Sequence, residues 1–142
     1  RSHLLIEQCR RRMEEPAQEI VAVREMCELC FDAVLGFFTG EEVPQPVFPD
    51  HSCPFFVSWK RAASGQLRGC IGSLSPRLIH TGLRDMALTS ALRDRRFAPV
   101  ELAELSGLVC TVSLLVRYEE AADYLDWTVG VHGLVIEFSA AG

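Results

Sequence analysis

The apolar residues between Ile20 and Phe38 recur at steps of three and four positions. This spacing places them on one face of a helix. The sequence therefore predicts an amphipathic helix over residues 20–38 that ends near Gly40. Three prolines then hold an extended loop up to Asp50.

Two short segments with alternating apolar and polar residues follow this loop. Residues 55–60 and 66–72 have the pattern of strands, and residues 62–65 have the composition of a turn. Because the connection is short, we expect these strands to pair as an antiparallel hairpin.

A second helix is predicted to begin at Ser75-Pro76, because serine can cap free backbone amides and proline fits the first helical position. It should run to about Arg93. Within it, Gly82 is expected to be a weak point that costs ~1 kcal/mol relative to alanine.

The rest of the chain contains two more strand patterns. Residues 108–116 are mostly apolar and rich in β-branched residues, which predicts a central strand, and residues 134–138 alternate as a final strand. Strands and helices are interleaved with hairpin signals. The predicted class is therefore α+β, with a mixed or antiparallel sheet flanked by helices.

The composition is that of one globular domain: 142 residues, 49% hydrophobic and 23% charged. We assign residues 1–19 to a flexible leader and residues 20–142 to the domain, and we expect Met13 to be the natural start. No apolar stretch approaches the ~20 residues of a membrane helix, and the first residues lack the pattern of a secretory signal. We therefore expect a protein of the cytoplasm, the nucleus or both, with reduced thiols and no membrane partner.

The net charge of −5 disfavours binding to nucleic acid, since that affinity comes mostly from cations that neutralise phosphates. All the cations except Lys60 are arginine. Arginine suits bidentate binding of carboxylate or phosphate, although a bias in the coding DNA explains the same usage.

The densest chemical signal lies in residues 67–72, Leu-Arg-Gly-Cys-Ile-Gly. On a strand, Arg68 and Cys70 share a face about 7 Å apart, where the guanidinium would favour the thiolate. The flanking glycines leave room for a ligand, and the helix expected at Pro76 would add anion-binding amides. The alternative is a small buried cysteine that only packs.

Two further signals are weaker. Cys27 and Cys30 have the spacing of half a zinc site or of a redox pair, but no second pair completes four ligands, and both fall on the predicted core face. No metal site is predicted. His132, in a turn before the last strand, is either a general base or a structural histidine.

Three segments, residues 67–72, 91–99 and 124–134, resemble the AMMECR domain family, named after the Alport syndrome, intellectual disability, midface hypoplasia and elliptocytosis chromosomal region. The resemblance runs from about Glu25 to Phe138. Family members continue beyond this point with a second hairpin strand and a C-terminal helical portion. We therefore expect a C-terminally truncated member, whose last strand lacks its hairpin partner.

The resemblance implies an α+β domain with a larger and a smaller subdomain and a cleft near residues 67–72. The resemblance implies that other members can carry an acid where this chain has His132, which makes Cys70 the stronger candidate. No cofactor is expected. The candidate catalytic residues are Cys70, Arg68 and His132, and the candidate ligand-binding residues are Gly69, Gly72, Ser73, Asp94 and Arg96.

Two functions are compatible with these residues. The first is a regulatory or binding module whose cleft holds a peptide or a small anionic ligand. The alternative is an enzyme or enzyme subunit in a protein or metabolite modification pathway, with Cys70 as nucleophile. For this alternative the resemblance implies Memo-like and radical-SAM-type partner proteins.

Overall fold

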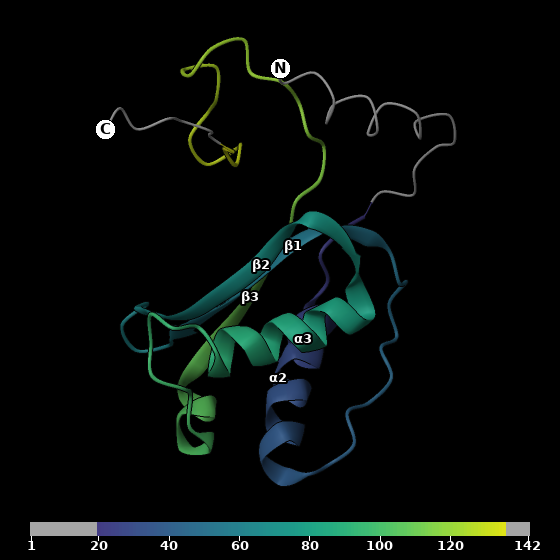
Figure 1. Cartoon of the computed structure of the whole chain (residues 1–142), viewed down its shortest axis with the longest axis vertical. Coiled ribbons are helices and arrows are strands. Elements are labelled where there is room, and N and C mark those ends of the chain that lie inside the picture. Colours follow the sequence, from purple (N-terminus) through teal and green to yellow (C-terminus); the bar gives the residue numbers. More distant parts are fainter. Residues whose placement is uncertain (1–19, 136–142) are drawn as a thin grey trace.

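The computed structural model describes residues 20–135, which form a three-stranded sheet with its helices on one face (Figure 1). The predicted leader, residues 1–19, and most of the predicted last strand lie outside the described residues. Leu134 and Val135, the described part of that strand, have no regular structure.

The first helix, α2, spans Arg24–Thr39 and begins four residues later than predicted. It ends as expected at Gly40, whose φ of 77° is in the left-handed region and whose N–H donates to the Gly36 carbonyl. Glycine adopts this conformation without the cost that a Cβ would bring.

The predicted hairpin is confirmed, and its strands are longer than the sequence pattern indicated. Strand β1 spans Ser52–Arg61 and β2 spans Leu67–Leu78, and they pair antiparallel. Gly65 has a φ of 68° in the connecting turn.

The predicted helix start at Ser75-Pro76 is wrong, because β2 continues through both residues and α3 spans Ile79–Leu92. The cap comes from a loop that is distant in sequence: an Asp50 carboxylate oxygen accepts the N–H of His80 at 2.9 Å. A cap supplied from elsewhere in the fold leaves no signal next to the helix in the sequence. The amides expected near Pro76 are therefore absent from the surroundings of Cys70.

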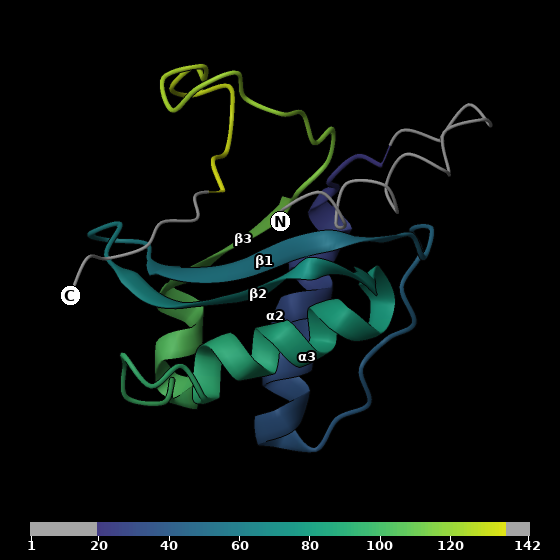
Figure 2. The same ribbon diagram turned by 45° about the horizontal axis from the view of Figure 1, so that its top comes forward.

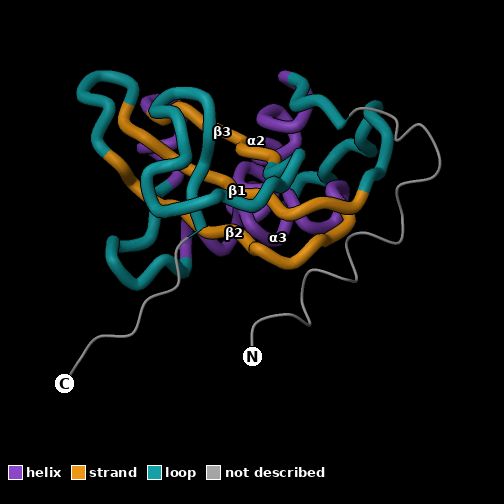
Figure 3. Tube along the Cα trace, turned by 90° about the horizontal axis from the view of Figure 1, so that it is seen from above, coloured by secondary structure: helices purple, strands orange, loops and turns teal. Residues whose placement is uncertain are grey.

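Strand β3, Leu108–Leu114, follows a short 3-10 helix, η1, at Leu102–Gly107. The strand order is β2-β1-β3, so β3 lies at an edge of the described sheet and β1 is central (Figure 3). The prediction that residues 108–116 form a central strand is wrong in position. All described pairs are antiparallel, and the α+β class is confirmed.

The core lies between the sheet and the two helices (Figure 2). The side chains of Phe55, Val57 and Trp59 in β1 are fully buried. Trp59 packs edge-on against Phe31 of α2, and its indole N–H donates to Ser90 Oγ of α3 at 3.0 Å. The central strand thus ties both helices to one face of the sheet.

Gly82, the expected weak point of the second helix, has a packing role. A Cβ at this position would lie 2.6 Å from the ring of Phe55. Glycine therefore lets α3 approach β1, and this close approach explains a residue that lowers helix propensity.

Candidate functional site

Arg68 lies at a bulge in β2 and serves as a buried anchor. The register moves from Trp59 opposite Gly69 to Lys60 opposite Leu67, which leaves Arg68 without a partner residue in β1. Its guanidinium donates to the carbonyls of Ala98 and Pro99 and to both carboxylate oxygens of Glu104. We expected Arg68 and Cys70 to share a face because side chains alternate along a regular strand. The bulge interrupts this alternation, and the two side chains have different partners.

Glu104, which sequence reasoning missed, holds this anchor in place. Its hydrogen bonds from Arg68 and from the Glu101 N–H lower its pKa from 4.5 to about 2. It also ion-pairs with Arg61 at 3.2 Å. The spacing of Glu101 and Glu104, which form a capping box around η1, was a sequence signal for this turn.

Asp94 and Arg96 bind the backbone of Cys70 along the outer side of β2. The Cys70 N–H donates to Asp94 Oδ2 at 3.0 Å, and Arg96 Nη2 donates to the Cys70 carbonyl at 2.9 Å. The hydrogen bonds from Arg96 keep the pKa of the buried Asp94 carboxyl well below its ordinary value. The structure thus brings Cys70, Asp94 and Arg96 together. The contacts join the backbone of Cys70 to the side chains of Asp94 and Arg96.

Gly69 and Gly72 are close-packing positions. A Cβ on Gly69 would overlap the backbone carbonyl of Ser90 in α3, and one on Gly72 would overlap the backbone carbonyl of Phe55 and the ring of Phe56. The two glycines therefore let a helix and an aromatic ring approach β2. Their ligand-binding role stays a prediction.

Ser73 lies away from Cys70. It is opposite Phe55 in the sheet, so it is on the face that carries the helices. Its hydroxyl donates to the Ser75 carbonyl and accepts the Ser75 N–H. The hydrogen bonds of this side chain thus stay within β2.

The Cys70 side chain lies on the sheet face away from the helices. Residues directly opposite in an antiparallel sheet point to the same side, and Cys70 is opposite Ser58, which is opposite Thr111 in β3. Ser58 Oγ donates to Cys70 Sγ at 3.1 Å. Thr111 is exposed, and Ser58 and Cys70 are half-buried. We call these three residues the open-face row.

His132 lies in the segment that leaves the sheet after β3 (Figures 1 and 2). Its Nδ1 accepts the Thr128 N–H at 2.9 Å, and its Nε2 lies 3.4 Å from a Glu119 carboxylate oxygen. These contacts lie within its own segment. Its role as a catalytic base stays a prediction.

The cysteines of α2 belong to the core. Cys30 is fully buried, Cys27 is half-buried, and both lie near Cys110 of β3. The hydrogen bond between the thiols of Cys27 and Cys110 raises the pKa of Cys27 well above its ordinary value. Among the described residues, no group of three histidine, cysteine or acidic side chains has the geometry to hold a metal ion.

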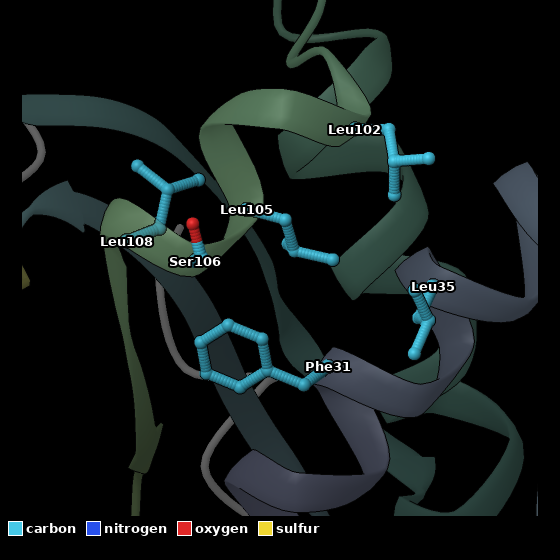
Figure 4. Close-up of a pocket in the computed structure, with 6 residues that line it drawn as sticks. All are labelled: Phe31, Leu35, Leu102, Leu105, Ser106 and Leu108. Atoms are coloured by element: carbon cyan, nitrogen blue, oxygen red, sulfur yellow. The ribbon is translucent and has the colours of Figure 1, made fainter.

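An apolar groove of about 410 Å³ separates α2 from η1 (Figure 4). Its walls are aliphatic and aromatic, with one hydroxyl at Ser106. A second, more polar hollow of about 230 Å³ lies beside Arg68, Gln66 and Phe97. No described helix is long and apolar enough to cross a membrane.

Comparison with known proteins places the chain among relatives that are themselves uncharacterised. The family model AMMECR1 matches residues 27–142. An uncharacterised protein of Arabidopsis thaliana is 51% identical over 123 residues, which is 84% of this chain and 58% of the relative. One of Schizosaccharomyces pombe is 39% identical over 84% of this chain and 64% of the relative.

A solved structure extends this comparison to the fold. The crystal structure of an uncharacterized protein from Pyrococcus horikoshii matches with a TM-score of 0.55 and 32% identity, over 63% of this chain and 48% of that one. The chain thus spans about half to two thirds of the length of these relatives.

Proposed function

This chain belongs to the AMMECR1 family, and we propose that it is a regulatory or binding module of the cytoplasm or nucleus. Its ligand, a peptide or a small anionic molecule, contacts the open-face row and the neighbouring outer side of β2.

One observation carries this proposal: the charged residues around Cys70 are committed to holding the fold, while the sheet face that carries its side chain has no described helix packed on it and leaves Thr111 exposed (Figure 2). Arg68 binds Glu104 and two carbonyls, and Asp94 binds backbone and Arg96. A nucleophilic cysteine needs a nearby base to take its proton. The hydrogen-bonding partner of the Cys70 sulfur among the described residues is the Ser58 hydroxyl, which is not a base.

The same contact supports the second candidate, an enzyme with Cys70 as nucleophile. The Ser58 hydroxyl donates to the Cys70 sulfur and Arg96 donates to the Cys70 carbonyl, so polar contacts hold the thiol in a defined position. In this reading, a Memo-like or radical-SAM-type partner protein would supply the remaining chemistry.

A blocking substitution tests the binding module. Random peptides displayed on phage and a panel of small anions are screened against the full chain and against Thr111→Trp, which places an indole in the open-face row. Thr81→Trp, at an exposed position of α3, is the matched control. We expect ligands that Thr81→Trp retains and Thr111→Trp loses; ligands lost equally by both variants, or no ligands at all, would contradict the module.

Cys70→Ser separates the two candidates. The binding module predicts an affinity within about twofold of the native chain, because the serine hydroxyl keeps a small polar group next to Ser58. The enzyme predicts a covalent adduct on Cys70 in the intact mass spectrum, and no adduct on the serine variant.

A further inference from the structure

The turn that follows α3 carries three arginines on a backbone that is held beside β2. The Phe97 N–H donates to the Asp94 carbonyl at 3.0 Å, which closes a turn with Arg95 and Arg96 at its two central positions. Asp94 Oδ1 accepts the Arg96 N–H at 3.2 Å. We call Arg93, Arg95 and Arg96 the arginine turn.

This turn is rigidly attached to the sheet. Asp94 and Arg96 both bind the backbone of Cys70, and the Arg96 guanidinium also lies 5.4 Å from the ring centre of Phe97. The Arg93 N–H donates to the Thr89 carbonyl at the end of α3. The backbone of the turn is therefore ordered before any ligand arrives, which lowers the entropy cost of binding.

Two of its guanidinium groups are uncompensated. Arg93 and Arg95 are exposed, and among the described arginines they are the ones whose side chains have no hydrogen-bond or ion-pair partner. Arg96 pairs with Asp94 at 2.8 Å, yet 59% of its side chain is exposed. A chain of net charge −5 thus concentrates free positive charge at one place.

We infer that the arginine turn is a docking surface for an acidic peptide segment of a partner protein. Guanidinium groups bind carboxylates through paired, directional hydrogen bonds. Arg96 binds the Cys70 carbonyl from the same turn, so a peptide on the open-face row reaches the arginines by crossing the outer side of β2. The inference rests on the proposed function and specifies the charge of its ligand.

Nucleic acid and lipid surfaces fit this patch less well. Their affinity grows with the number of cations that neutralise phosphates, and this turn offers three arginines around one carboxylate on a negatively charged chain. A short acidic peptide needs few cations and brings little repulsion from the rest of the surface.

The test measures fluorescence anisotropy of a fluorescein-labelled peptide of alternating Glu and Ser residues with the full chain. The variant R93Q/R95Q removes the two free charges. R24Q/R77Q, which changes the net charge equally at two exposed and paired arginines, is the matched control. Thermal unfolding confirms that both variants fold.

We expect R93Q/R95Q to weaken binding about tenfold and R24Q/R77Q to change it less than about twofold. Raising the salt from about 50 to about 300 mM should weaken native binding, because exposed charges are screened. A Gln-and-Ser peptide should bind at least about tenfold more weakly than the Glu-and-Ser peptide.

Equal weakening by both variants, equal affinity for the two peptides, or no binding of the acidic peptide would overturn the inference. Tighter binding of a random DNA duplex or of phosphatidylserine vesicles through Arg93 and Arg95 would replace the peptide with that partner. If the acidic peptide fails while uncharged peptides are still lost with Thr111→Trp, the docking surface is wrong and the proposed function stands. If both fail, the proposed function is wrong as well.

Discussion

The alpha carbon of Gly69 in β2 lies so close to the backbone carbonyl of Ser90 in α3 that no Cβ fits between them. Gly69, in the segment of residues 67–72, therefore lets helix and sheet approach closely at this point. The neighbouring Ser90 hydroxyl accepts the indole N–H of Trp59 at 3.0 Å, which links this approach to the centre of the core.

Gly69→Ala should destabilise the protein by about 3 kcal/mol, because the new methyl group must displace backbone atoms, which are less adaptable than a side chain. Urea unfolding followed by circular dichroism measures the change. Gly107→Ala, with no heavy atom within 4 Å of the new Cβ, is the control and should have little effect. A loss of the same size in both variants would show that the close approach is not responsible.

Asp94→Asn should cost about 2–3 kcal/mol in the free energy of unfolding, because an amide cannot accept all the hydrogen bonds that the buried carboxylate accepts. These come from the Cys70 N–H and from the backbone and guanidinium of Arg96. Asp85→Asn removes an exposed carboxylate paired with Arg77 and should cost less than about 1 kcal/mol. Similar values for the two variants would contradict the importance of the Cys70 contact.

The stability of the protein should fall in acid through the same carboxylates. Hydrogen bonds from Arg96 lower the pKa of Asp94, and those from Arg68 lower the pKa of Glu104 to about 2. A depressed pKa stabilises the fold above the unfolded value, about 4, and this contribution is lost as the pH falls toward and below 2.

Glu104→Gln should therefore flatten this acid dependence. Unfolding midpoints measured between about pH 7 and pH 2 should fall less steeply for this variant than for the native chain, and its stability at neutral pH should be lower by about 2 kcal/mol. Glu28→Gln, at an exposed pair with Arg24, serves as control. An unchanged slope in Glu104→Gln would mean that the Arg68 anchor contributes nothing to acid sensitivity.

Alkylation should distinguish the cysteine of the open-face row from those of the core. Cys30, Cys53 and Cys110 are buried, and burial raises the pKa of Cys53. Cys70 is half-buried on the sheet face away from the helices. With iodoacetamide at neutral pH, Cys70 should be labelled before these three, as followed by mass spectrometry of peptides. Labelling of all four only on unfolding would show that the face is closed.

The local sequence patterns predicted which helices and strands form more accurately than they predicted where these elements lie in the fold. The spacing of apolar residues located α2 within a few residues, and the alternation around residues 62–65 located the hairpin. The start of α3 was misplaced because its cap, Asp50, comes from a distant loop. The position of β3 was wrong because an apolar strand can be covered by helices at an edge as well as in the centre.

The candidate site shows the same division. The sequence singled out residues 67–72 and 91–99, and the structure brings these two segments together. The sequence could not predict the bulge at Arg68, because a bulge depends on the partner strand. In the structure the Arg68 guanidinium binds Glu104 at this bulge. Ser58 and Thr111 became visible only through the register of the sheet, because nothing in their local sequence distinguishes them.

The turn after α3 also has a consequence for how molecules of this protein meet one another. The edge of a sheet exposes N–H and C=O groups that can pair with a strand of another chain and start aggregation. At Cys70 the N–H is already bonded to Asp94 and the C=O to Arg96, and the Arg96 side chain that covers this part of the edge is charged and 59% exposed. An intruding strand would have to break two charge-assisted hydrogen bonds before it could form its ladder. We therefore expect Asp94 and Arg96 to disfavour edge-to-edge pairing of β2 with β2 of a second molecule.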